Sequence, residues 1–103
     1  MELEELKKAL EKESLKDAVL IGLPEERDNY YPAIVEVDEK LGRVTYDYDL
    51  LVECFANGFE KKFPEKSWKD IMLDVIDHVD FNVLRSLPYC GEHAPIVRLP
   101  EYS

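Results

Sequence analysis

The strongest sign of reactive chemistry in this chain is a cysteine that precedes a histidine by three residues. Cys90 and His93 are separated by Gly91 and Glu92. A thiolate beside an imidazole is the arrangement that activates a cysteine nucleophile, and the glycine would leave the sulfur accessible. No third group that would orient the imidazole is evident, so an ordinary loop cysteine and a solvated histidine are expected. A small enzyme or ligand-binding domain that uses Cys90 and His93 is kept as an alternative function.

A second cluster contains residue types that bind metals and joins His78 to Asp74 and Asp77. Structural zinc takes four ligands rich in cysteine and histidine, and the spacing here matches no such form. The glycines are isolated from one another, so the sequence has no glycine-rich phosphate loop either. The sequence therefore predicts no metal, no cofactor and no catalytic residues, and the chain is expected not to be an enzyme.

Three aspartates, Asp70, Asp74 and Asp77, fall at i, i+4 and i+7 of a predicted helix. They lie opposite an apolar stripe on that helix and line an exposed ridge about 10 Å long. The polar face of a predicted hairpin adds three further acids: Glu36, Asp38 and Asp47. The ordinary interpretation is a pair of solvated faces. The functional hypothesis is that these acidic surfaces occupy a basic groove that normally holds nucleic acid.

Two adjacent tyrosines, Tyr30 and Tyr31, stand in the loop region that precedes the hairpin. Tyrosine is favoured at protein interfaces because it offers a rigid apolar ring and a polar tip. We therefore expect both tyrosines to contact a partner beside the acidic groups.

The chain is strongly acidic, with 23 Asp and Glu against 13 Lys and Arg and a formal net charge of −10 over 103 residues. Nucleic acid and anionic membrane surfaces bind basic proteins, so neither is expected as a direct ligand. No apolar run approaches the ~20 residues of a membrane span, and the N-terminus lacks the pattern of a signal peptide. The two cysteines form no spacing motif. These features predict a cytoplasmic location and a protein partner with a basic surface.

The elements that must position these residues follow from the apolar pattern. A single domain over 1–103 is predicted, with an N-terminal helix at 1–14, strands at 15–48 that include a hairpin at 33–48, helices at 49–87 and an extended segment at 88–103. The apolar period changes from two to about 3.6 at Asp49, which is predicted to cap the first of these helices. Ser67 is predicted to cap the second helix and Asp80 the third.

Two further strands are predicted outside the hairpin. Residues 17–22 are continuously apolar after Asp17 and indicate a buried strand, and residues 96–99 lie between prolines and indicate an edge strand. The order α-β-β-β-α-α-β separates strands from helices. It therefore predicts an α+β fold with a small antiparallel sheet of three to four strands and helices packed on one face.

Several short segments together carry a resemblance. They are Pro-Ala-Ile at 32–34, Gly-Arg-Val at 42–44, Tyr-Asp-Tyr-Asp at 46–49, Ile-Asp-His at 76–78, Asn-Val-Leu-Arg-Ser-Leu-Pro-Tyr at 82–89, Gly91, and Ala-Pro-Ile at 94–96. Over about 31–99 the layout resembles small uncharacterised bacterial, phage or mobile-element proteins. Such families carry no assigned activity, so the resemblance implies no functional residue. It implies a bacterial cytoplasm and a mobile-element origin, a setting that favours a host-interaction or anti-defence role.

The first functional prediction is a non-enzymatic acidic interaction protein that binds a basic macromolecular partner. In its narrower form it is a phage or mobile-element inhibitor that mimics nucleic acid. Two alternatives from other classes stay open: the small enzyme or ligand-binding domain, and a structural homodimer that pairs through the edge strand at 96–99 or through an uncovered sheet face.

Overall fold

A computed structural model describes residues 2–100 and confirms an α+β fold. The predicted hairpin consists of β1 (Ile34–Asp38) and β2 (Arg43–Asp47), which pair antiparallel. The backbone N–H of Leu41 donates to the Asp38 carboxylate over 3.0 Å, which closes the turn. Gly42 has a φ of +65°, a conformation that favours glycine, so the turn position predicted for it is confirmed.

The third strand, β3 (Ile96–Arg98), lies beside β2 at the edge of the sheet, as predicted. It runs parallel to β2, so the sheet is mixed and the expectation of a wholly antiparallel sheet is wrong. A long helical connection between β2 and β3 allows this direction, because it carries the chain back before the third strand begins. The last three residues of the extended segment predicted at 88–103 lie outside the described residues.

The buried strand predicted at residues 17–22 is not formed. Its backbone groups bond elsewhere: the Val19 N–H donates to the His93 carbonyl, and the Ile21 N–H donates to the Tyr46 hydroxyl, each over 3.0 Å. Gly22 then turns the chain with a φ of +102°. The apolar run packs against the core through Leu20 and Ile21, as predicted. It is irregular, and its backbone N–H groups donate to acceptors outside the segment instead of to a neighbouring strand. The element order is therefore α-β-β-α-α-β.

The helices begin with α1 (Leu3–Leu10), followed by α2 (Tyr48–Lys62) and α3 (Trp68–His78). Ser67 caps α3 as predicted, because its hydroxyl accepts from the Asp70 N–H over 3.2 Å. The cap of α2 is Asp47 and not Asp49, since the Asp47 carboxylate accepts from the Leu50 N–H over 3.0 Å.

No separate helix begins at Asp80, and that prediction is wrong. The chain continues from α3 through a π-helical turn, η3 (Val79–Val83), into a 3₁₀ helix, η4 (Leu84–Tyr89). Asp80 accepts a hydrogen bond from the Tyr48 hydroxyl over 2.9 Å instead of capping a helix. Two further 3₁₀ helices, η1 (Glu13–Leu15) and η2 (Arg27–Ala33), precede the hairpin.

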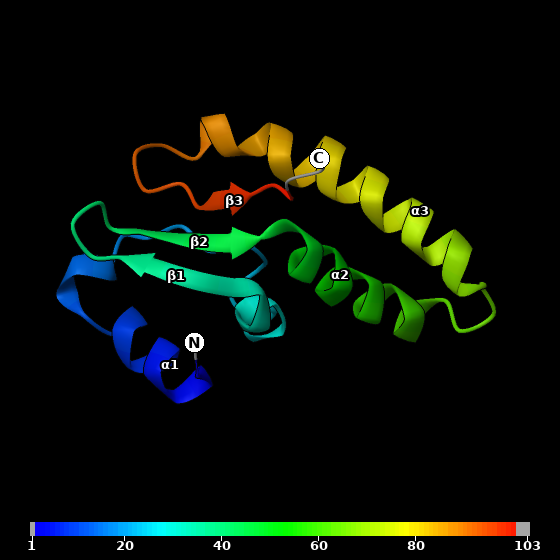
Figure 1. The fold of residues 1–103 in the computed structure, drawn as a ribbon, viewed down its shortest axis with the longest axis horizontal. Coiled ribbons are helices and arrows are strands. Elements are labelled where there is room, and N and C mark those ends of the chain that lie inside the picture. Colours follow the sequence, from blue (N-terminus) through cyan, green and yellow to red (C-terminus); the bar gives the residue numbers. More distant parts are fainter. Residues whose placement is uncertain (1, 101–103) are drawn as a thin grey trace.

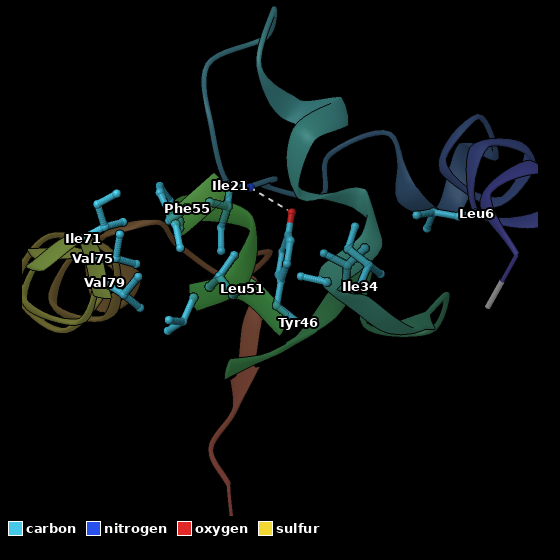
Figure 2. Packing of buried hydrophobic residues seen from close by; sticks show 13 residues of the cluster. Leu6, Ile21, Ile34, Tyr46, Leu51, Phe55, Ile71, Val75 and Val79 are labelled. Carbon is cyan, nitrogen blue, oxygen red and sulfur yellow. Dashed lines mark hydrogen bonds between the residues drawn. The ribbon is translucent and has the colours of Figure 1, made fainter. Parts of the chain in front are cut away.

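The core forms a row that follows the longest dimension of the molecule, 43 Å against 28 and 27 Å for the other two. Figure 1 shows α2 and α3 running beside each other away from the end of the sheet, while α1 lies on the side of β1. Figure 2 shows Tyr46 near the middle of the row, with Ile34 toward Leu6 of α1 and Leu51 toward α3. Among residues 2–100, no helix has the length and apolar content that a membrane crossing requires.

Candidate partner-binding surface

The three aspartates predicted to form a ridge are exposed on α3. Asp70, Asp74 and Asp77 point away from the side chains of Ile71 and Val75, which the same helix buries in the core. Their placement follows from helical periodicity, because positions four and seven residues apart share one face. The structure therefore brings these three predicted site residues together.

One of the three carboxylates is already paired. The Lys66 ammonium lies 2.7 Å from the Asp74 carboxylate. This hydrogen bond raises the pKa of Lys66, and the charges of Asp74, Asp70 and Glu65 add to the effect. Asp70 and Asp77 have no hydrogen bond or ion pair through their side chains among residues 2–100. These two carboxylates are therefore the ones available to an external partner.

Large apolar side chains stand beside the two available carboxylates. Leu73 is 57% exposed and Phe81, in η3, is 55% exposed. With Asp70 and Asp77 they fall at i, i+3, i+7 and i+11, the spacing of one helical face. We call these four residues the α3 outer face. The Arg85 guanidinium lies 4.5 Å from the centre of the Phe81 ring and borders this face.

The acids of the hairpin have partners within the fold. The Glu36 carboxylate forms an ion pair with Arg98 of β3 over 2.8 Å. Asp38 closes the hairpin turn and Asp47 caps α2. Each of the three therefore has a structural role, and the hairpin does not present the row of unengaged carboxylates that the sequence suggested.

The two tyrosines predicted to contact a partner are partly buried. The Tyr30 ring packs on Phe55 of α2, with 4.6 Å between the ring centres. Burial raises the pKa of Tyr30 and of Tyr31. Tyr30 and Tyr31 belong to η2 and pack against the core, not on the α3 outer face.

Cys90 and His93 are held by different groups. The His93 Nδ1 lies 3.2 Å from the carbonyl oxygens of both Leu41 and Gly42, at the hairpin turn. The Cys90 thiol donates to the Ser86 carbonyl over 3.4 Å. In the described part of the chain no hydrogen bond joins the thiol to the imidazole, so the geometry lacks the contact that would activate the nucleophile.

A cleft of about 390 Å³ lies between residues 19–23 and the helical segment that runs from α3 to η4. His78, Asn82, Ser86 and Cys90 line it at intervals of four residues, and the Asn82 amide lies 3.1 Å from the His78 Nδ1. Sequence reasoning missed this row, although its i+4 spacing is visible once the segment is known to be helical throughout. The Ser86 hydroxyl and the Cys90 thiol both donate to backbone carbonyls, so neither has a free donor for a ligand.

The potential metal ligands are not assembled into a site. Asp74 is engaged by Lys66, and His78 packs between Phe55 and Phe59, with 5.1 and 5.8 Å between ring centres. Within the described residues, no group of three or more His, Cys, Asp and Glu side chains could hold a metal ion.

No family model, curated protein or solved structure matches this chain.

Proposed function

We propose that this protein is a non-enzymatic interaction protein that binds a basic protein surface through the α3 outer face. The observation that carries the proposal is the pairing, on one exposed helix face, of two unpartnered carboxylates with Leu73 and Phe81. Carboxylates steer a basic partner and set its register, whereas apolar area supplies affinity. A face that has both kinds of group is better suited to binding than an acidic ridge alone.

The charge of the whole chain supports the same choice of partner. The formal net charge of −10 attracts a basic surface at long range and repels polyanions. Lys66 is paired with Asp74, so the two unpaired carboxylates and the exposed Leu73 and Phe81 define what this face offers to a partner. The partner is therefore expected to combine basic side chains with an apolar centre.

The narrower proposal is that the partner's basic surface is one that otherwise holds nucleic acid. This version rests on net charge, because Glu36, Asp38 and Asp47 are engaged within the fold. Of the six acids predicted to bind a partner, only Asp70 and Asp77 have no side-chain partner among residues 2–100. Competition separates the two versions. A duplex DNA that displaces the protein from its partner supports mimicry, whereas simultaneous binding of both contradicts it.

The experiment is a capture from bacterial lysate with three immobilised proteins at moderate salt, with identification by mass spectrometry. They are the wild type, a variant with Asp70→Asn and Asp77→Asn, and a control with Glu4→Gln and Glu5→Gln on α1. Both variants lose two negative charges, so the control separates the face from net charge. Glu4 and Glu5 are exposed. A basic protein retained by wild type and control but lost by the α3 variant is expected. Equal capture by all three proteins, or no specific capture by the wild type, would overturn the proposal.

The two alternatives from the sequence stay predictions. A ligand-binding or catalytic role would now use the cleft lined by Cys90 and not a Cys90–His93 pair. A homodimer through β3 would use the outer edge of this strand, because β3 is the last strand of the sheet. Sedimentation at high concentration tests the homodimer directly.

A further inference from the structure

Arg27 has no carboxylate partner among residues 2–100, although acids outnumber bases in this chain. Its side chain is partly buried, and its Nε is buried with no hydrogen-bond partner among residues 2–100. An unpartnered buried donor on a charged group destabilises a fold, so proteins usually pair it. With 23 carboxylates in the sequence, the absence of a partner calls for a physical reason.

Arg27 lines a cleft of about 400 Å³ between α1, residues 15–18 and η2. Three cations line this cleft, Lys7, Lys16 and Arg27, against two carboxylates, Glu11 and Asp28. The lining therefore has a formal charge of +1 from three positive and two negative groups, whereas the chain has −10. Lys16 is also paired with Glu13 over 2.6 Å, so Lys7 and Arg27 are the cations available to a ligand, and the two carboxylates of the lining balance their charge.

The rest of the cleft is apolar. Leu10, Leu15, Ala18 and Leu20 line it together with Tyr31. Burial raises the pKa of Tyr31 and of Tyr46, and the positive charge of Arg27 partly opposes this rise at both phenols. The Tyr46 hydroxyl already accepts from the Ile21 N–H, whereas Tyr31 lines the cleft and its hydroxyl has no hydrogen bond among residues 2–100.

We propose that this cleft, the Arg27 cleft, binds a small monocarboxylate with an apolar body. The planar guanidinium matches a carboxylate in two parallel hydrogen bonds, and the leucines would cover an apolar chain or ring. Glu11 and Asp28 repel additional negative charge, so they select a single carboxylate over a phosphate or a dicarboxylate. The site shares no residue with the α3 outer face, so it is independent of the proposed function.

The test measures thermal unfolding during titration with sodium hexanoate at constant ionic strength. Hexanamide serves as the uncharged analogue, and inorganic phosphate serves as an anion without an apolar body. Above ten times its dissociation constant, hexanoate is expected to raise the unfolding midpoint of the wild type by about 5 °C or more. The other two probes are expected to have little effect. No saturable shift with hexanoate, or an equal shift with phosphate or hexanamide, would overturn the proposal.

Two variants and a control locate the binding group. Arg27→Met is expected to unfold no earlier than wild type without ligand, because it removes an unpartnered buried donor, and to lose the hexanoate shift. Arg85→Met, which removes the same charge on η4, is expected to keep the shift. Arg27→Lys retains the charge without the two-pronged geometry and is expected to bind hexanoate at least about tenfold more weakly. Wild-type binding by Arg27→Met or by Arg27→Lys would contradict the proposal.

Discussion

The backbone N–H of Ile21 donates a hydrogen bond to the hydroxyl of Tyr46 over 3.0 Å, and this bond ties the segment before the hairpin to the central strand. Tyr46 is fully buried, and Figure 2 shows the bond at the middle of the core. The bond replaces a strand pairing for residues 17–22. It also gives the buried phenol the partner that a polar group in a core requires.

The first prediction concerns the change Tyr46→Phe. It leaves the Ile21 N–H buried without an acceptor, so the free energy of unfolding is expected to fall by about 1–3 kcal/mol. Urea denaturation measures this loss. Tyr89→Phe is the matched control, because Tyr89 is 90% exposed and its hydroxyl is expected to change stability by less than about 0.5 kcal/mol. Equal stability of Tyr46→Phe and wild type would contradict the importance of the bond.

The second prediction is a loss of stability at alkaline pH. Burial raises the pKa of Tyr46 to about 12 from the ordinary 10.0, although the hydrogen bond from Ile21 partly opposes this shift. Between these values the unfolded tyrosine loses its proton while the folded one keeps it. The stabilisation is therefore complete below pH 10 and is lost as the pH rises toward 12, by about 3 kcal/mol in total.

The control for this pH dependence is Tyr46→Phe. Tyr30 and Tyr31 also have raised pKa values and destabilise the fold in the same pH direction, but they do so in both proteins. The difference between wild type and Tyr46→Phe across pH 10 to 12 therefore isolates Tyr46. Parallel stability curves over that range would show that Tyr46 titrates normally.

The third prediction separates the two aspartates at the start of α2. Asp47→Ala removes the capping acceptor of the Leu50 N–H and is expected to cost about 1 kcal/mol of unfolding free energy. Asp49→Ala removes only a charge in the first turn and is expected to cost about 0.3–1 kcal/mol, at the lower end because Asp49 is exposed. Urea unfolding of both variants measures the difference. A larger loss for Asp49→Ala would return the cap to the position expected from the sequence.

The fourth prediction concerns the two thiols. Burial raises the pKa of Cys54, so its thiolate is scarce near neutral pH and its alkylation is expected to be slower than that of free cysteine. Cys90 lines an open cleft and is expected to react faster than Cys54, but no faster than free cysteine, since no imidazole activates it. Iodoacetamide labelling followed by peptide mass spectrometry measures both rates. A Cys90 that outpaces free cysteine would favour the catalytic alternative.

Local patterns in the sequence predicted much of the fold. The hairpin, the turn at Gly42, the Ser67 cap and the edge position of β3 each follow from residues close together in the chain. Two of the errors concern long-range partners. Residues 17–22 look like a strand until Tyr46 supplies their acceptor, and the direction of β3 depends on the whole path through α2 and α3.

In the candidate site, too, some features could be predicted from local sequence and others could not. Helical spacing alone placed Asp70, Asp74 and Asp77 on one exposed face. It could not show that Lys66 engages Asp74 or that Arg98 engages Glu36, because both contacts depend on three-dimensional structure. The Asp47 cap is a local contact with Leu50, and it was missed because Asp49 is a second capping residue type two positions later. Leu73 and Phe81 were missed because an exposed apolar residue gains significance only from its neighbours on the folded surface.

Binding through the α3 outer face is tested by the dissociation constant of the purified partner. It is measured for the wild type, for the variant with Asp70→Asn and Asp77→Asn, and for the control with Glu4→Gln and Glu5→Gln. At about 50 mM salt, the α3 variant is expected to bind at least about tenfold more weakly than wild type, while the control stays close to wild type. At high salt the difference is expected to shrink, because screening weakens the lost contacts. Equal dissociation constants for wild type and the α3 variant at low salt would show that α3 is only a solvated face.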